Sequence, residues 1–358
     1  MMKYSLIICS HNEEKFIGKT IRNILFYIKE REDVEIVIID DNSSDKTNKI
    51  IQTFSSKKLK LISLKKNRGI SFCRNLGVSN AEGKYLVFLD SHITLNHNIF
   101  KVYDSLLEKY NSIDGITGKY ISTSKNDYNR IRDVVRSVYR KKDESDFIIT
   151  HNNFTTISSC IFCVKKEIIK KNHFSIDFNK VAAEDTFLQL VLMDKGYKFL
   201  HSNKISINHD AELSFTGLLK KIIYQCRGTH RLLANYAKSG KSNIPYLTFY
   251  LDFPLLSFIS FYALLVPSII FGFKAYYLVI FLFSLLVDFH KLYLLVPNKR
   301  FKFKRKLGTA IYIFLNEGVK IFDWPISIFR EKYSLKDFIL VVKIILVWQV
   351  KKIMRSKK

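Results

Sequence analysis

The first 90 residues alternate between two hydrophobic periods, and this alternation constrains the fold more than any other feature of the sequence. Short, nearly continuous apolar runs predict β-strands at residues 4–9, 34–39, 60–64 and 84–89. Apolar residues at helical spacing predict the intervening helices at residues 14–27, 45–54 and 70–81. Strands and helices in this order indicate an α/β fold with a mostly parallel sheet that helices cover on both faces.

Polar residues follow each predicted strand. They occupy positions 10–13 (SHNE), 40–45 (DDNSSD), 67–69 (NRG) with Arg74 one helical turn later, and 90–92 (DSH). Ligands of a parallel sheet bind beyond the carboxyl ends of its strands, so these residues are expected around one crevice. Carboxylates, an Asp/His pair and an arginine in one crevice suit a nucleotide diphosphate bound with a divalent cation.

The next hundred residues predict a less regular continuation of the same domain. Strands are expected at residues 113–121, 157–164 and 204–208, a helix at 185–194, and a surface helix or mobile loop at 122–145. The five cysteines are sparse and odd in number, which argues against a disulfide framework and favours a reducing compartment. Cys160 and Cys163 lie in an apolar run without a second pair at metal-site spacing, so a structural role is expected for both.

Charge and hydropathy change in the C-terminal part. The chain has a net charge of +26, of which residues 1–210 carry +9 and residues 211–358 carry +17. The 21 residues 253–273 contain no charge and are long enough to span a membrane, a weaker apolar run covers 275–287, and a basic cluster follows at 299–306. A membrane hairpin would leave the N-terminal domain cytoplasmic, because positive residues stay on that side. The basic C-terminal part is therefore expected to bind anionic lipids of the cell membrane and not nucleic acid.

Several motifs together resemble the family 2 glycosyltransferases of the GT-A fold. They are SLIICSHNE, VIIDDNSSDKT, NRGISFCRN, GKYLVFLDSHI and AEDTFLQLVLMDKGYKF, and they cover about residues 4–210. Downstream, residues 224–228 (YQCRG) resemble the segment that joins catalytic domain and membrane helices in the exopolysaccharide-type branch, although the first glycine of the usual stretch is missing. The resulting organisation is a GT-A catalytic domain (1–215), an amphipathic linker (216–245), a membrane hairpin (246–298), and basic interfacial helices with a tail (299–358).

The resemblance implies roles for the residues in the donor site. Asp41 matches the residue that hydrogen-bonds the base of the donor, and a carboxylate there suits uracil or guanine. The donor nucleotide set implied by the matching motifs is Ser10, Glu13, Asp41, Arg74 and Asp90. Asp40 is expected to brace its loop and Asp45 to cap a helix, both of them structural roles.

The resemblance also implies a metal site and a catalytic base. Asp90 matches the first position of the Asp-x-Asp motif, and His92 stands at its third position in place of Asp. An Asp/His pair still suits Mn²⁺ or Mg²⁺, with imidazole favouring the softer Mn²⁺. His209 matches a histidine that often completes the metal site, and a structural role is an equally open alternative. Asp185 matches the general base of inverting members.

Two further residues are expected near the acceptor. Glu184 and Arg227 are placed on the acceptor side, with Glu184 expected to orient its neighbours and not to transfer protons. The predicted enzyme is an inverting glycosyltransferase that moves a sugar from a UDP- or GDP-sugar to a hydroxyl of a lipid-linked glycan or cell-surface polysaccharide precursor. A polyprenyl-phosphate sugar synthase is the enzymatic alternative, and a non-catalytic basic protein that binds nucleic acid or lipid is the alternative from another class.

Overall fold

The computed structural model describes residues 1–123, 145–150, 155–178 and 181–210, together with some helical residues between 217 and 235. Residues 1–126 and 142–212 form one compact unit, and residues 127–141 and 213–358 form a second. All the named strands and helices below belong to the first unit. The division into four segments expected from the sequence stays a prediction.

The first four strands form the parallel half of a single sheet. They are β1 (Tyr4–Ser10), β2 (Val34–Asp40), β3 (Leu59–Ser63) and β4 (Tyr85–Asp90). Each agrees with its predicted strand to within one residue at either end, and they lie side by side in the order β3-β2-β1-β4, all parallel. Their carboxyl ends therefore meet at one edge, as the sequence predicts.

The other half of the sheet is mixed, and the expectation of a mostly parallel sheet is wrong there. Its strands are β5 (Ile93–Leu95), β6 (Gly115–Ser122), β7 (Phe147–Ile148), β8 (Ile161–Lys165) and β9 (Phe199–His209). β8 runs antiparallel to both β4 and β6, and β5 and β7 run antiparallel to β9, whereas β6 and β9 are parallel. An apolar run predicts a buried strand but carries no information on its direction, which explains the error.

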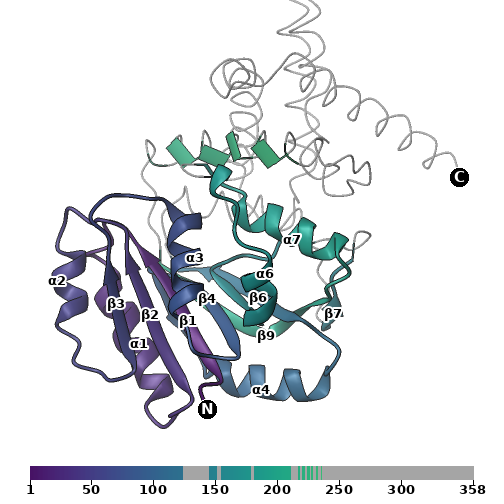
Figure 1. Cartoon of the computed structure of the whole chain (residues 1–358). Coiled ribbons are helices and arrows are strands. Elements are labelled where there is room, and N and C mark those ends of the chain that lie inside the picture. Colours follow the sequence, from purple (N-terminus) through teal and green to yellow (C-terminus); the bar gives the residue numbers. More distant parts are fainter. Residues whose placement is uncertain are drawn as a thin grey trace, which may run out of the picture. The chain divides into compact units, whose positions relative to one another are not determined.

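Helices cover both faces of the sheet (Figure 1). One core packs α1 (Ile17–Ile28), α2 (Thr47–Gln52) and α4 (Ile99–Lys109) against one face. The other core packs α3 (Ile70–Asn80), α6 (Lys166–Lys171) and α7 (Glu184–Asp194) against the opposite face, and a 3₁₀ turn at Ile176–Phe178 lies near α3. The sheet thus lies between two helical layers. Because both faces are covered, ligands are expected at the carboxyl ends of the strands.

The α3 helix packs directly against the sheet, and two glycines fix its position there. A Cβ atom at Gly77 would lie 2.5 Å from Cγ2 of Ile7, so a larger residue there would force Ile7 or α3 to move. Gly69, immediately before α3, has φ +82°, a conformation that residues with a side chain rarely adopt. Both glycines fix α3 against the parallel strands and so fix the position of Arg74 on it.

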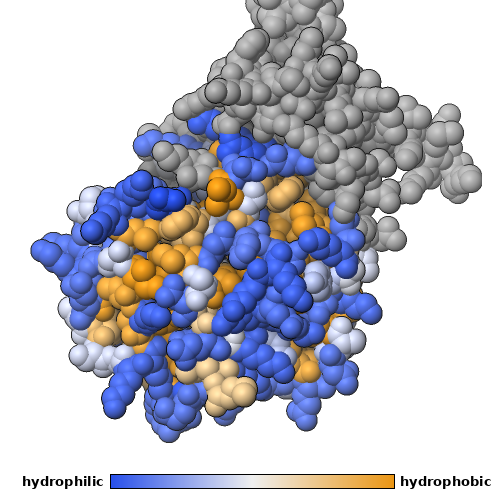
Figure 2. All heavy atoms as spheres, in the orientation of Figure 1, coloured by the Kyte–Doolittle hydropathy of each residue, from blue (hydrophilic) through white to orange (hydrophobic). Residues whose placement is uncertain are grey.

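On the α3 side of the sheet, the surface over β2 and β3 is less polar than the rest of that face (Figure 2). Figure 2 shows apolar residues gathered there, where Ile62, Leu64 and Leu76 are only half-buried around a small core of Val37, Ile39 and Cys73. Among the described residues, no helix has the length and apolarity needed to cross a membrane. The predicted segments 253–273, 275–287 and 299–306, and nearly all of 122–145, lie outside the described residues.

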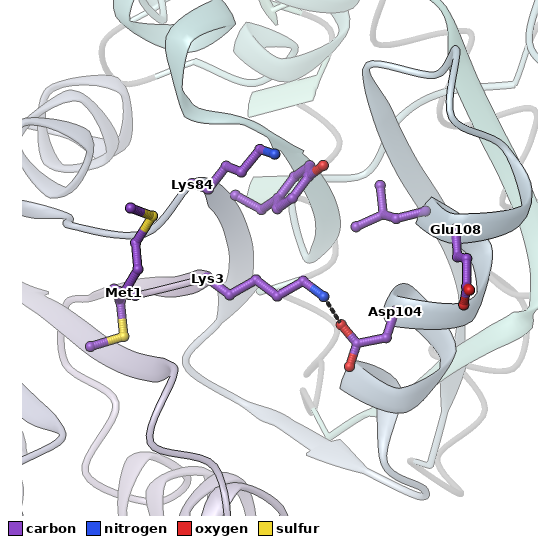
Figure 3. Close-up of a pocket in the computed structure, with 8 residues that line it drawn as sticks. Met1, Lys3, Lys84, Asp104 and Glu108 are labelled. Atoms are coloured by element: carbon purple, nitrogen blue, oxygen red, sulfur yellow. Dashed lines mark hydrogen bonds and ion pairs between the residues drawn. The ribbon is translucent and has the colours of Figure 1, made fainter.

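A charged network closes the amino-terminal end of the parallel strands. The Asp104 carboxylate of α4 accepts hydrogen bonds from Lys3 Nζ (2.5 Å), Tyr4 Oη (2.8 Å) and Arg31 Nη1 (2.6 Å). Figure 3 shows the shallow pocket beside it, lined by Met1, Lys3, Lys84, Asp104 and Glu108 among others. This end lies opposite the strand-end motifs, and its contacts are those of a structural ion-pair network.

Candidate active site

The loops that follow β1 and β2 are tied to each other. Asn12 has a left-handed backbone (φ +56°), and its Oδ1 accepts a hydrogen bond from the Ser44 amide at 2.8 Å. The Asn12 amide donates to Ser43 Oγ at 3.0 Å, and the Glu13 amide donates to Thr47 Oγ1 at 2.7 Å. The two motifs that the sequence places at separate strand ends therefore form one surface.

Asp40 braces its loop as expected, whereas Asp45 has a structural role one residue before the helix cap, which is Lys46. Asp40 Oδ1 accepts from Ser43 Oγ at 2.5 Å, and its Oδ2 accepts from Asn48 Nδ2 at 2.8 Å. Asp45 accepts the Thr47 amide at 2.9 Å in the turn that opens α2. Both carboxylates thus hold the second loop in shape and leave Asp41 as the ionisable group at the carboxyl end of β2 that faces α3.

Asp41 is buried at the N-terminus of α3. Its Oδ1 accepts the Arg68 amide at 2.6 Å and its Oδ2 accepts the Gly69 amide at 2.8 Å. A carboxylate in this position is favoured by the helix dipole as well as by the two hydrogen bonds. Ser10, at the end of β1, is also buried, and its hydroxyl has no hydrogen-bond partner among the described residues. Ser10 and Asp41 thus provide polar atoms in the expected nucleotide crevice.

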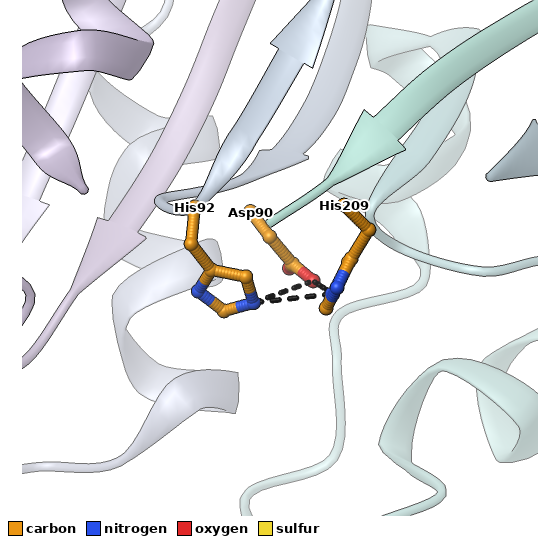
Figure 4. A group of neighbouring side chains, drawn as sticks. All are labelled: Asp90, His92 and His209. Carbon is orange, nitrogen blue, oxygen red and sulfur yellow. Dashed lines mark hydrogen bonds and ion pairs between the residues drawn. The ribbon is translucent and has the colours of Figure 1, made fainter. Parts of the chain in front are cut away.

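Asp90, His92 and His209 form a compact cluster at the carboxyl edge (Figure 4). Asp90 ends β4, His209 ends β9, and His92 lies in the turn between β4 and β5. The Asp90 Oδ2 atom lies 3.5 Å from Nε2 of His209 and 4.0 Å from Nε2 of His92, and the two Nε2 atoms are 3.1 Å apart. Ligand atoms that share one divalent ion at about 2.1 Å each stand up to roughly 4.2 Å apart, so these three donors fit a single cation.

The electrostatics of Asp90 favour its charged form. Burial raises the pKa of this carboxyl, but the hydrogen bond from His209 and the electrostatic interactions with His92, His209 and Arg74 outweigh it and hold the pKa well below its usual range. A carboxylate that stays ionised beside two imidazole nitrogens is a donor set that Mn²⁺ accepts readily.

Neighbouring residues hold the turn and the strand end that carry the two histidines. The hydroxyl of Thr20 on α1 lies 2.9 Å from the carbonyl oxygens of both Ser91 and Ile93, on either side of His92. Asp210, directly after His209, accepts from Lys19 Nζ and Thr94 Oγ1, each at 2.6 Å. These two anchors were missed from the sequence, although an Asp next to the candidate ligand His209 was a signal for the second.

Arg74 and Glu184 form a buried ion pair between α3 and the first residue of α7. Burial raises the pKa of Glu184, and the guanidinium of Arg74 lowers it without cancelling that effect. The charges of Glu184, Asp185 and Asp90 all act on Arg74 and raise its pKa despite burial. Arg74 therefore interacts electrostatically with Asp90 as well as with the start of α7.

Asp185 is the second residue of α7 and is half-buried. Its Oδ2 accepts from both the amide and the hydroxyl of Ser159, at 3.2 and 3.0 Å, and its Oδ1 accepts the Thr186 amide at 2.7 Å. Ala183, which precedes the helix, has a left-handed backbone (φ +76°). The carboxylate is thus held in one orientation by a strained turn and a serine that sequence reasoning did not single out.

The structure brings most of the predicted residues together and assigns some of them different contacts. Glu13, expected in the nucleotide set, contacts His92 through its Oε1 at 3.1 Å from Nδ1. Arg74, expected beside the phosphates, is paired with Glu184. Arg227 is helical and belongs to the second unit.

Residues 5–172 match the model of glycosyl transferase family 2. Over 241 residues the chain is 27% identical to the poly(ribitol-phosphate) β-N-acetylglucosaminyltransferase TarP of Staphylococcus aureus, a match that covers 62% of this chain and 71% of TarP. A match to S. aureus TarS, with the same described activity, is 26% identical and spans 35% of that longer protein.

Solved structures of related shape agree with the observed sheet. The mannosyltransferase PcManGT of Pyrobaculum calidifontis, solved with GDP-Man and Mn²⁺, superposes with a TM-score of 0.60 at 16% identity over 89% of this chain and 87% of that one. Residues 1–349 of S. aureus TarS, solved with UDP-GlcNAc, superpose with a TM-score of 0.53 at 16% identity over 93% of both chains. At this identity the likeness establishes the fold, which is a mixed α/β sheet of the GT-A type.

Proposed function

We infer that this chain, which contains a glycosyltransferase family 2 domain of the GT-A fold, transfers a sugar from a nucleotide-diphosphate donor to a hydroxyl group of an acceptor glycan. One observation carries the proposal: the Asp90–His92–His209 cluster lies at the sheet edge where the donor motifs end. Arg74, which is paired with Glu184 beside the candidate base Asp185, also interacts electrostatically with Asp90.

The residues divide the work between the two substrates. Ser10 and Asp41 line the nucleotide crevice, where a carboxylate accepts a ring N–H of uracil or guanine. Asp90, His92 and His209 would hold the divalent cation. When bound there, Mn²⁺ or Mg²⁺ would supply positive charge beside the diphosphate leaving group.

Asp185 accepts the proton of the acceptor hydroxyl while that oxygen attacks the anomeric carbon. Ser159 keeps the carboxylate oriented for this transfer. A single displacement of this kind inverts the anomeric configuration and needs no covalent carboxylate intermediate. Glu184 keeps Arg74 in place and takes no proton in this scheme.

UDP-GlcNAc and a polyol-phosphate polymer are the first donor and acceptor to test. TarP is described as acting on poly(ribitol-phosphate), and TarS has been solved with UDP-GlcNAc. An anionic phosphate polymer also suits a chain of net charge +26. We further propose attachment to the cell membrane through residues 246–358, with the catalytic domain in the cytoplasm.

The test is a screen of nucleotide sugars for release of the nucleotide diphosphate in Mn²⁺, first without and then with poly(ribitol phosphate). UDP-GlcNAc should be hydrolysed slowly alone and consumed faster with the polymer, which should gain N-acetylglucosamine of inverted configuration by NMR. Absence of turnover with every UDP- and GDP-sugar, with and without acceptor, contradicts the proposal.

A further inference from the structure

The side chain of Glu13 contacts the candidate metal ligand His92 from the side away from the candidate cation site. Its Oε1 lies 3.1 Å from Nδ1 of His92, and the two side chains are 22% and 20% exposed. Figure 4 shows that the other ring nitrogen of His92, Nε2, points toward Asp90 and His209. His92 therefore has one nitrogen on a carboxylate and the other on the candidate metal site.

The backbone around Glu13 is fixed independently of its side chain. The Glu13 amide donates to Thr47 Oγ1 at 2.7 Å, and its carbonyl accepts the amides of Phe16 and Ile17, each at 3.0 Å. The carboxylate thus projects from a rigid loop toward an imidazole that Thr20 anchors through the adjacent carbonyls. The contact joins two well-fixed elements, so shortening the Glu13 side chain is not expected to move the loop.

A carboxylate can only accept a hydrogen bond, so its contact with His92 requires the proton on Nδ1. The Nε2 atom then presents a lone pair to the cation site, which is the form of imidazole that binds metals. A carboxylate on the far nitrogen also fixes the ring orientation and increases the basicity of the ligating nitrogen. An imidazole without such a partner can place its proton on Nε2 and lose this ligand.

We propose that Glu13 is a positioning residue that holds His92 in the tautomer and orientation required to bind the divalent cation. This assignment replaces the direct nucleotide contact expected from the sequence. It rests on the metal role of Asp90, His92 and His209 in the proposed function. The tautomer matters only because residue 92 is a histidine, since an aspartate at this position has no tautomer to select.

The experiment measures binding of Mn²⁺ alone to the full-length chain, without nucleotide, from the electron paramagnetic resonance signal of the free ion. Glu13→Ala should raise the Kd for Mn²⁺ by about 10–100-fold, the usual effect of removing such a partner. The matched control is Glu14→Ala. Glu14 is the next residue and accepts the Lys46 amide through Oε2 at 3.0 Å, so its removal should leave the Kd within about twofold of the wild-type value.

The His92→Asp variant tests whether Glu13 acts on Mn²⁺ affinity through His92 or through a general effect on the cation site. In a His92→Asp chain the ligand needs no tautomer, so adding Glu13→Ala should not weaken Mn²⁺ binding further. An equal loss of affinity in both backgrounds would overturn the inference, as would an unchanged Kd in Glu13→Ala alone. Melting temperatures without metal should match between Glu13→Ala and Glu14→Ala, and a selective drop in Glu13→Ala would identify a folding role instead.

The outcomes also distinguish this inference from the proposed function. A wild-type chain that binds no Mn²⁺ overturns both the metal role and the positioning role of Glu13. Mn²⁺ binding that is insensitive to Glu13 overturns only the positioning role and leaves glycosyl transfer in place. Isotope-filtered NMR of the His92 ring adds a direct readout, because the proton should lie on Nδ1 in the wild-type chain and lose that preference in Glu13→Ala.

Discussion

Arg74 and Glu184 are 110 residues apart in the sequence and form an ion pair that is more than nine-tenths buried. The pair fastens α3, which begins beside Asp41, to α7, which carries Asp185. In the proposed function this contact joins the donor side of the domain to the acceptor side. Loss of either partner should affect stability and catalysis together.

Removal of one partner of this pair should be strongly destabilising. Glu184→Ala leaves a buried guanidinium without its carboxylate and should lower the free energy of unfolding by about 3–5 kcal/mol. Replacing both residues by methionine removes both charges and should cost clearly less than the sum of the two single methionine changes. Urea unfolding of the wild type, Glu184→Ala, the two single methionine variants and the double variant gives these values, and simple additivity of the two methionine changes would contradict a direct energetic coupling.

The sequence predicts the strand-end geometry well, because that geometry depends on local patterns. The strands ending in Ser10, Asp40 and Asp90 are parallel neighbours, so their following residues had to meet at one edge. The Asp90–His92 part of the cation cluster follows from the same reasoning. His209 was placed only by resemblance. It ends β9, which lies more than 100 residues after β4 in the sequence and pairs with β5 and β6 and not with β4.

Partnerships between distant side chains were not predictable from the same patterns. Arg74 was expected to face phosphates. Nothing in the pattern of residues 70–81 predicts its observed partner, the carboxylate of Glu184, which lies 110 residues later in the sequence. The three-residue strand β5 is too short for a periodic signal. The helix α4 was also missed, although Asn98 caps it by accepting the amides of Phe100 and Lys101 and so was a readable start signal.

Removal of the divalent cation should abolish turnover. EDTA should stop release of the nucleotide diphosphate and added Mn²⁺ should restore it, because the leaving diphosphate otherwise faces the negative charge of Asp90. His209→Ala removes one of three donors and should raise the Mn²⁺ concentration for half-maximal activity by at least about tenfold. Full activity in EDTA is the result that would exclude a catalytic cation.

Asp41→Asn should lower donor affinity and stability together. Both carboxylate oxygens accept backbone amides at the start of α3, and an asparagine turns one of these acceptors into an NH₂ group that faces an N–H. The expected loss in unfolding free energy is about 1–3 kcal/mol. Calorimetric titration with the donor nucleotide and urea unfolding measure the two effects, and unchanged stability would show that the α3 contacts of Asp41 contribute little.

The hydrogen bonds and ion pairs of Asp104 should make the free energy of unfolding decrease at acidic pH. The pKa of Asp104 is lowered: burial raises it, but the hydrogen bonds from Arg31, Lys3 and Tyr4 outweigh burial. A carboxyl whose folded pKa is depressed adds stability above its unfolded value of 3.8, and that stability is lost as the pH falls through the folded pKa. Asp104→Asn should therefore be less stable than the wild type at pH 7, by about 1 kcal/mol or less, and should lose less stability on acidification.

Urea unfolding between neutral pH and a pH below 3.8 tests this pH dependence. Glu108→Gln is the control, because Glu108 is an exposed carboxylate one turn further along α4. The control should follow the wild-type profile. An Asp104→Asn profile parallel to that of the wild type would show that Asp104 is not the group responsible.

Asp185→Asn should produce a large fall in kcat with donor affinity nearly unchanged. Asparagine keeps the size of the side chain and its carbonyl can still accept the Ser159 and Thr186 hydrogen bonds in part, but it cannot take a proton. General-base catalysis contributes about 10²–10⁴-fold, which corresponds to roughly 3–5 kcal/mol of barrier.

Ser159→Ala distinguishes the catalytic role of Asp185 from the orienting role of the Ser159 hydrogen bonds. It leaves the carboxylate of Asp185 in place but removes one of the donors that orient it, so its kcat should fall less than that of Asp185→Asn. Single-turnover kinetics with saturating donor, together with the donor Kd, measure these effects for both variants. If Asp185→Asn keeps more than about a tenth of the wild-type kcat, a hundredfold base contribution is excluded. An acceptor phosphate, which needs little help in losing a proton, would then fit the chemistry better than a hydroxyl, and polyprenyl phosphate would become the acceptor to test next.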